Sequence, residues 1–261
     1  MVMGNGDKAA EQRPLTALPV RVLASQGEVR MSDDIFKPAP GVLEAARTRR
    51  SIRAYLNKPV PTEVLREIVA LGRHAPSGSN IQPWRVHALT GSTLARVGTA
   101  IQRAFLTDEP GHKRDYDYYT DPIEEPYLAR RRQCGWGLYS TLGIGRGDRE
   151  KSRAYRATNY NFFGAPAGLI FTIDRKLERG SWLDYGMFLQ TIMLAARAKG
   201  LHTCAEAAIA SYPDIVRREL DITTDWIVIC GMAMGYADPD AVINTFQPPR
   251  IEVDEYAVFL D

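Results

Sequence analysis

Hydrophobic positions along the chain recur with two different periods, and the change of period separates expected helices from expected strands. Four apolar residues follow Pro59 and Pro61 at helical spacing: Val64, Leu65, Ile68 and Val69. This spacing predicts an amphipathic helix, with Thr62 as its capping residue. Directly after Pro83 the period falls to two, since Trp84, Val86 and Ala88 alternate with polar residues, which predicts a strand.

The same reading gives the remaining elements. Helical patterns are expected at 42–46, 93–105, 127–142, 151–161, 185–199 and 212–220. Gly200 supplies the stop signal of the central helix at 185–199. Two almost continuous apolar runs, 167–173 and 226–234, are typical of strands buried on both faces. Strands interleaved with helices indicate an α/β or α+β domain.

Two segments lack this regularity. Residues 1–38 mix glycine, proline and charge, which predicts a flexible N-terminal arm before a single domain at 39–261; whether Met31 is an alternative start stays open. The second segment, DYDYYTDPIEEPYLARRR at 115–132, is a long irregular insertion rich in tyrosine. Such insertions more often form a lid or a partner contact than part of a core.

Composition narrows the classes of partner. Lys and Arg total 33 against 31 Asp and Glu, a net charge of +2, so nothing favours nucleic acid or an anionic membrane as a partner. The most apolar helix is interrupted by Gln190 and Arg197, and the N-terminus lacks an apolar secretion signal, so we expect neither a membrane span nor export. Three widely separated cysteines suit a reducing cytoplasm and are interpreted as small core residues: Cys134, Cys204 and Cys230.

The densest group of charges is ARTRRSIRAY at 46–55. Arg49, Arg50 and Arg53 with Ser51 between them supply forked cationic donors and a hydroxyl, a combination suited to a phosphate group. The alternative is that these arginines only favour the dipole at a helix C-terminus and face water. Residue types alone leave both interpretations open.

Two small-residue segments complete the candidate chemistry. In HAPSGSNIQPWRVHAL at 74–89, Asn80 and Gln82 offer amides that donate and accept at once, which matches the polar edge of a heterocycle, although turns favour the same residues. A second turn is expected at TCAEAA, 203–208. A flat, nucleotide-like cofactor would use both segments together with the arginine cluster.

Other motifs are weak. The segment GIGRG at 143–147 has three glycines spaced GxGxG: Gly143, Gly145 and Gly147. Because it follows a helical pattern, it predicts a turn between helices and not a dinucleotide fingerprint. The four histidines share no metal-ligand spacing with one another or with the cysteines, so no metal site is expected. Ser-Gly-Ser is not the GxSxG elbow of a serine hydrolase.

Five motifs, in order, resemble the FMN-dependent nitroreductase family: RRSIRAY, APSGSNIQPW, GLHTCAEAAIASYPDIVRREL, IVICGMAMGYAD and FQPPR. The resemblance covers residues 41–261. It implies an α+β, nitroreductase-like fold with a central, mostly antiparallel sheet flanked by helices. It also implies an intertwined homodimer with two FMN molecules at the interface, each contacted by both chains.

The resemblance assigns cofactor-binding residues by position. Those at the ribityl phosphate would be Arg49, Arg50, Ser51, Arg53 and Arg250, and Ile52 among them would also bind the cofactor. The partner chain would contribute Pro76, Ser77, Asn80 and Gln82, and the isoalloxazine ring would lie along Ala205, Glu206 and Ala207. The chain departs from the pattern at this last place, because many members carry Pro-Gln where it has Ala205-Glu206. At this place the resemblance implies contacts from the backbone to the flavin, and it assigns none to the acidic side chain.

The activity implied is reduction of nitroaromatic or quinone-like acceptors by NAD(P)H in a ping-pong reaction through flavin N5, with no catalytic side chain. The sequence does not distinguish NADH from NADPH. Four tyrosines of the insertion are expected to form the rim of the substrate pocket or, equally, to pack a dimer interface: Tyr116, Tyr118, Tyr119 and Tyr127. The alternatives are a same-fold flavin enzyme of another class, such as a dehalogenase or a flavin-fragmenting enzyme, and a non-catalytic protein that sequesters FMN.

Overall fold

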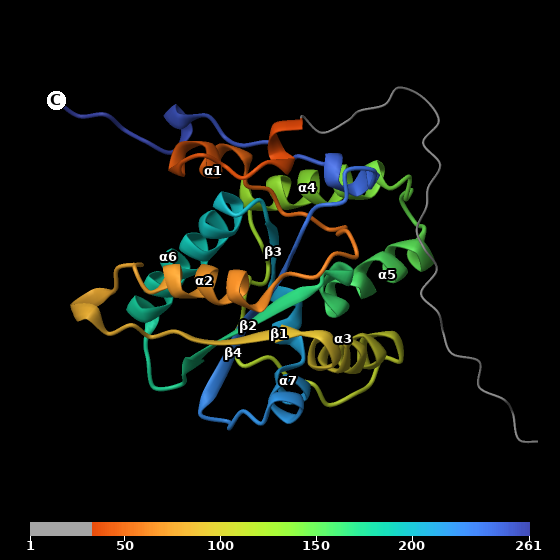
Figure 1. Ribbon diagram of the computed structural model, residues 1–261. Helices are drawn as coiled ribbons and strands as arrows, with labels where there is room; N and C mark the ends of the chain where they lie inside the picture. Colours follow the sequence, from red (N-terminus) through yellow and green to blue (C-terminus); the bar gives the residue numbers. More distant parts are fainter. Residues whose placement is uncertain (1–32) are drawn as a thin grey trace, which may run out of the picture.

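The computed structural model describes residues 33–261, folded around one four-stranded sheet (Figure 1). The strand order is β1-β2-β4-β3, and every neighbouring pair is antiparallel. The strands are β1 (Arg85–Thr90), β2 (Ala167–Asp174), β3 (His202–Glu206) and β4 (Trp226–Gly235). The expected antiparallel sheet with flanking helices is therefore confirmed, and the chain is of the α+β class.

Alternation along the central strands divides the core into two layers. On β2, Leu169 and Phe171 face one hydrophobic cluster while Ile170 between them faces the other, because successive strand side chains point to opposite faces. Helices α2 (Thr62–Gly72) and α6 (Arg179–Ala198) cover the first face. The second face is covered by α3 (Gly91–Leu106), α7 (Pro213–Leu220) and the 3-10 segment Thr158–Gly164. This two-sided cover explains the continuous apolar runs in β2 and β4.

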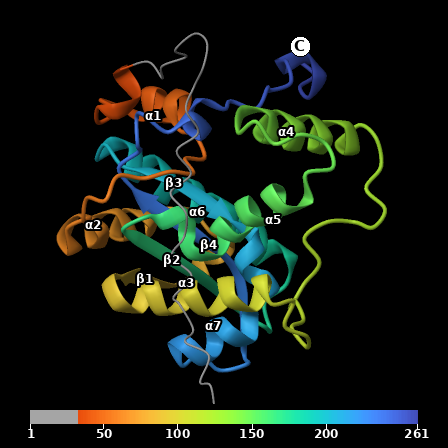
Figure 2. The ribbon, with the colours of Figure 1, turned by 90° about the vertical axis from the view of Figure 1, so that its right-hand side faces the viewer.

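Three helices lie outside this sandwich (Figure 2). Helix α1 (Val42–Thr48) packs on α6, and α5 (Arg149–Ala157) leads into the 3-10 segment. Helix α4 (Tyr127–Thr141) contains no buried residue. Its main contact is with the C-terminal segment, where Phe246 lies so close to Gly137 that an added Cβ would be 2.7 Å from the Phe246 ring. The glycines after α4 form the expected turn between helices.

Several local predictions were wrong. Thr62 is the first residue of α2 and makes no side-chain cap, because Pro61 occupies the N-cap position. The predicted turn at 203–208 is instead the edge strand β3, followed by a 3-10 turn from Ala207. Small residues suit an edge strand that approaches other backbone closely as well as they suit a turn. Cys134 is only half-buried on α4, whereas Cys204 and Cys230 are buried as expected.

Only the end of the predicted N-terminal arm, 33–38, falls within the described residues, and the rest of that prediction and the question of Met31 lie outside them. Residues 33–38 pack on the domain. Ile35 is 1% exposed, and its carbonyl accepts a hydrogen bond from Nε2 of His202 at 2.9 Å. The buried Arg197 donates to the carbonyl of Lys37 at 3.2 Å. The boundary of the arm at residue 38 stays a prediction.

Gly168 on β2 gives a direct test of the packing of the second layer. A Cβ at this position would lie 2.6 Å from Cδ1 of Leu94 and 2.9 Å from the Phe162 ring. Gly168→Ala is therefore expected to lower the free energy of unfolding in urea by about 1–3 kcal/mol, the usual effect of overpacking. Gly186→Ala is the control, because its Cβ would meet nothing within 4 Å on α6 and alanine favours helix. Equal stability of the two variants would contradict this packing.

Candidate functional site

The predicted phosphate cluster lies where α1 ends, beside the C-terminal segment (Figure 1). Arg49 is the C-cap residue of α1, with extended backbone that turns the chain toward the sheet. A cavity of about 170 Å³, called here the arginine pocket, is lined by Arg47, Arg49, Arg50, Ser51, Arg53, Phe246, Gln247, Pro248 and Arg250. The structure thus brings Arg250 to the arginines that precede it by some two hundred residues in the sequence, as expected.

Asn244 holds the two walls of the arginine pocket together. Its side-chain oxygen accepts the backbone N–H groups of Arg53 at 2.9 Å and Ala54 at 3.2 Å, and its amide nitrogen donates to the carbonyl of Ala54 at 2.8 Å. Asn244 is 2% exposed, so these bonds are shielded from water. Sequence reasoning missed this residue, because nothing local marks an asparagine whose partners are so remote in the chain.

The pocket is also fixed to the sheet. Ser51 pairs with Thr203 of β3 in a parallel bridge, and the N–H of Ile52 donates to the Thr203 carbonyl at 3.2 Å. The Ile52 side chain is fully buried, and its carbonyl accepts from the hydroxyl of Tyr55 at 2.9 Å. Ile52 therefore anchors the backbone between the arginines and does not line the pocket.

Within the described part of the chain, the arginines of the pocket lack carboxylate partners. Within residues 33–261, Arg49, Arg50, Arg53 and Arg250 make no ion pair with a carboxylate. Burial lowers the pKa of Arg49, and the charge of Arg250 lowers this pKa further. Burial likewise lowers the pKa of Arg50. In the amide orientation that satisfies both groups, Gln247 accepts from Arg50 at 2.7 Å and 2.8 Å. Mutually repelling guanidinium groups around a cavity are suited to a multiply charged anion.

The end of β3 lies next to this pocket. Ala205 is exposed, Glu206 is buried and Ala207 is half-buried, so the end of β3 and the turn that follows it present two small side chains outward and one acidic side chain inward. Burial raises the pKa of Glu206 well above its usual range, against the opposing effect of Arg53. The bridge between Ser51 and Thr203 connects this strand to the arginine pocket, so the two predicted cofactor segments are neighbours in one chain.

The third predicted segment lies elsewhere. The loop with Pro76, Ser77, Asn80 and Gln82 follows α2 at the edge of the molecule, apart from α1 in Figure 1, and all but the half-buried Ser77 are exposed. Its backbone is in the left-handed region at Ser79, Asn80 and Gln82, with φ of 49°, 57° and 52°. The N–H of Gly78 donates to Asp184 of α6 at 3.1 Å, which holds this strained loop in place.

The tyrosine-rich insertion is more firmly attached than expected. The Tyr116 hydroxyl donates to the carbonyl of Ile229 at 2.5 Å, and its ring packs edge-on against Trp182. Asp115 accepts from Arg175 at 2.9 Å and also pairs with Arg217. The start of the insertion is thus part of the domain, which corrects the prediction for Tyr116.

The other three tyrosines remain at the surface. Tyr118, Tyr119 and Tyr127 are 51%, 55% and 66% exposed. Arg131 of α4 lies over the Tyr119 ring at 4.8 Å, and Arg130 over the Tyr127 ring at 5.9 Å. Cation–π contacts of this kind hold aromatic faces in position. Substrate binding and interface packing therefore both stay open for these side chains.

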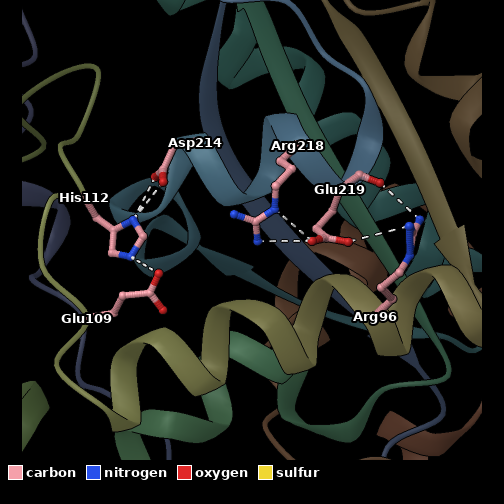
Figure 3. A network of polar contacts seen from close by, with 6 residues as sticks. All are labelled: Arg96, Glu109, His112, Asp214, Arg218 and Glu219. Atoms are coloured by element: carbon pink, nitrogen blue, oxygen red, sulfur yellow. Dashed lines mark hydrogen bonds and ion pairs between the residues drawn. The ribbon is translucent and has the colours of Figure 1, made fainter.

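Figure 3 shows a polar network between α7 and the segment made of α3 and the loop that follows it. Nδ1 of His112 contacts Asp214 at 2.9 Å, and Nε2 lies 3.7 Å from Glu109. Arg96 and Arg218 both pair with Glu219. His112 in the loop after α3 contacts Asp214 of α7, and Arg96 of α3 pairs with Glu219 of α7, so the network ties α3 and its following loop to α7. Among the described residues no group of three or more His, Cys, Asp and Glu side chains is arranged to hold a metal ion.

Taken together, the α+β domain has a cationic pocket beside a strand of small residues, an arrangement whose charge is suited to an anionic group. The model of the nitroreductase family matches residues 46–236. A chloronitrobenzene nitroreductase of Comamonas testosteroni is 38% identical over 85% of this chain and 98% of that protein. The chain belongs to the nitroreductase family.

Solved structures agree with this assignment. An FMN- and NADPH-dependent nitroreductase, NfnB, from Sphigopyxis sp. strain HMH has a TM-score of 0.82 and 35% identity over 85% of this chain and 99% of its own. The FMN-dependent nitroreductase NfnB from Mycobacterium smegmatis, in complex with NADPH, has a TM-score of 0.80 and 31% identity, covering 85% of this chain and all of its own. No helix in residues 33–261 is long and apolar enough to cross a membrane.

Proposed function

We propose that the protein is an FMN-dependent NAD(P)H oxidoreductase that reduces nitroaromatic compounds. The observation that carries the proposal is the arginine pocket, whose guanidinium groups have no carboxylate partner within residues 33–261 and whose charges repel one another. The phosphate of FMN supplies the missing negative charge. Similar proteins include an FMN- and NADPH-dependent nitroreductase, an FMN-dependent nitroreductase in complex with NADPH and a chloronitrobenzene nitroreductase, which supports this cofactor and this class of acceptor. Quinone-like compounds are further candidate acceptors.

Each wall of the site has a task in this proposal. Arg49, Arg50 and Arg250 bind the phosphate by charge-assisted hydrogen bonds, with Ser51 as a hydroxyl donor. Ala205 and Ala207 leave room for a flat ring beside the strand, because their side chains are small and outward. Bound FMN supplies hydride transfer with nicotinamide and acceptor, so the protein contributes orientation and exclusion of water and needs no acid–base pair of its own.

The loop at 76–82 belongs to the same proposal through a second copy of the chain. It is exposed and distant from the arginine pocket of its own chain, so its amides reach a flavin only across a dimer interface. The C-terminal residues Val258, Phe259 and Leu260, which are 83%, 78% and 90% exposed, supply apolar surface for such an interface. We therefore include a homodimer with FMN between the subunits, and place it in the cytoplasm because all three cysteines are free.

Anaerobic reduction tests the function. The purified protein is expected to be yellow, to bleach when NADPH or NADH is added, and to recover its absorbance when a nitroaromatic compound such as nitrobenzene follows. NADPH is the first nucleotide to try, since one NfnB relative is NADPH-dependent and the other forms a complex with NADPH. Protein that binds FMN and bleaches with neither nucleotide would favour sequestration, whereas bleaching without reoxidation by nitrobenzene would favour another flavin chemistry.

A further inference from the structure

Glu206 is a buried acid that the proposed reaction does not use. It is 3% exposed at the end of β3, directly opposite Gly231 of β4. Both of its carboxylate oxygens are buried and have no hydrogen-bond partner within residues 33–261. An ionised carboxylate in such a place loses its hydration without compensation, so burial favours the neutral acid. A buried acid of this kind beside a ligand pocket is a candidate for a role in ligand binding.

Arg53 connects this acid to the arginine pocket. It lines the pocket, and it is also the charge that acts on Glu206. The two side chains form no ion pair; Nη1 of Arg53 donates instead to the carbonyl of Ser51 at 3.1 Å. The charge of Arg53 thus acts on the buried carboxyl of Glu206, and its side chain lines the pocket in which a phosphate would bind, so both acidic groups would gain from the same guanidinium.

We propose that Glu206 links the binding of the FMN phosphate to the binding of a proton. FMN binds tightly to the protein in which Glu206 is protonated, because a neutral carboxyl leaves the charge of Arg53 to the phosphate. Ionised Glu206 weakens FMN binding, since it competes for Arg53 and adds a negative charge near the phosphate. Glu206 is thus a positioning residue that acts through Arg53. The inference rests on the proposed function, which supplies the phosphate.

Linkage fixes the sign of the effect. If FMN prefers protonated Glu206, bound FMN raises the pKa of this carboxyl. The affinity for FMN then falls as the pH rises through the pKa that Glu206 has in the FMN-free protein. A tenfold loss of affinity corresponds to one unit of change in this pKa on binding. Burial raises the pKa of Glu206 well above its usual range, so the loss of FMN affinity is expected well above the pH at which an exposed glutamate titrates.

The neighbouring groups do not titrate in that range. The groups that interact with Glu206 are Arg53, Tyr55, Cys204 and Cys230. Burial raises the pKa of Cys204 and of Cys230 to about 12, and raises the pKa of Tyr55 well above its usual value. At the other end of β3, burial lowers the pKa of His202 to about 4, so this imidazole is neutral. Glu206 is left as the group whose charge changes near the pocket.

The test measures the dissociation constant of FMN for FMN-free protein, by quenching of flavin fluorescence, at about pH 5 and about pH 9. Wild type and Glu206→Gln, a neutral side chain of the same shape, are expected to bind equally at the lower pH. At the higher pH wild type is expected to bind about tenfold more weakly than Glu206→Gln. Glu63→Gln on the exposed side of α2 is the matched control and should follow wild type at both values. Riboflavin, which lacks the phosphate, should show no such difference between wild type and Glu206→Gln.

A second measurement uses wild type alone, so the test does not depend on the folding of a variant. Calorimetry at about pH 9 in two buffers of different ionisation enthalpy is expected to show proton uptake when FMN binds, and none when riboflavin binds. Parallel affinity profiles for wild type and Glu206→Gln, or FMN binding without proton uptake, would overturn the link through Glu206 and leave the proposed function intact. Absence of FMN binding at every pH would overturn the proposed function and the link with it.

Discussion

Replacing Arg49 by alanine is expected to weaken FMN binding by about ten- to a hundredfold. A hydrogen bond to a charged group contributes about 1.5–3 kcal/mol, and each 1.4 kcal/mol changes affinity tenfold. Arg49 is half-buried in the arginine pocket, and burial and then the charge of Arg250 lower its pKa, so both guanidinium groups would gain from one shared dianion. Arg250→Ala should have an effect in the same range. The measurement is the dissociation constant of FMN when it is added back to FMN-free protein.

The control for both variants is Arg73→Ala. Arg73 is an exposed arginine at the C-terminal end of α2 and does not line the pocket. Its removal changes the net charge by the same amount, so any general electrostatic effect on an anionic ligand appears in all three proteins. Unchanged FMN affinity in both Arg49→Ala and Arg250→Ala would refute the phosphate assignment. A loss of the same size in Arg73→Ala would show that the effect is long-range attraction and not contact.

The sequence was sufficient for elements whose signal is local. The helix around Ile68, the strand after Pro83 and the two apolar strands stand where periodicity placed them, because each buries one stripe or both faces against the same core. The same reading failed at β3, since small residues such as Ala205 satisfy a turn and an edge strand equally well. It also failed at Thr62, where Pro61 takes the cap position.

The candidate site was predictable in part. Forked cationic donors around Ser51 indicated phosphate chemistry without any knowledge of the fold. That Arg250 and Asn244 join them depends on how the last segment crosses α1, and no local pattern encodes a contact over such a separation. The burial of Glu206 was equally hidden, because a charged residue in a run of alanines is usually exposed. Whether the loop at 76–82 meets a flavin depends on a second chain, and it stays a prediction.

Phe188→Ala is expected to lower the free energy of unfolding by about 3–5 kcal/mol, the range for truncating a large buried aromatic side chain. Phe188 is 2% exposed on α6. Its ring stacks on Trp84 with centroids 4.6 Å apart and planes 6° from parallel, and it meets Phe171 and Tyr185 edge-on at 6.3 Å and 5.7 Å. Removal of the ring leaves a cavity lined by all three. Urea unfolding followed by tryptophan fluorescence measures the loss.

Phe188 is also connected to the proposed site, because its ring stacks on Trp84. This indole follows the exposed loop at 76–82 and leads into β1, so the stack on Phe188 fixes the loop at its C-terminal end while Asp184 fixes it at Gly78. Leu183→Ala on the same helix is the control, because Leu183 is 73% exposed and its truncation is expected to change stability by at most about 0.5 kcal/mol. Similar losses in the two variants would mean that α6 does not bury this face. A large loss confined to Phe188→Ala, with FMN released at lower urea concentration, would show that the aromatic layer under the loop supports cofactor retention.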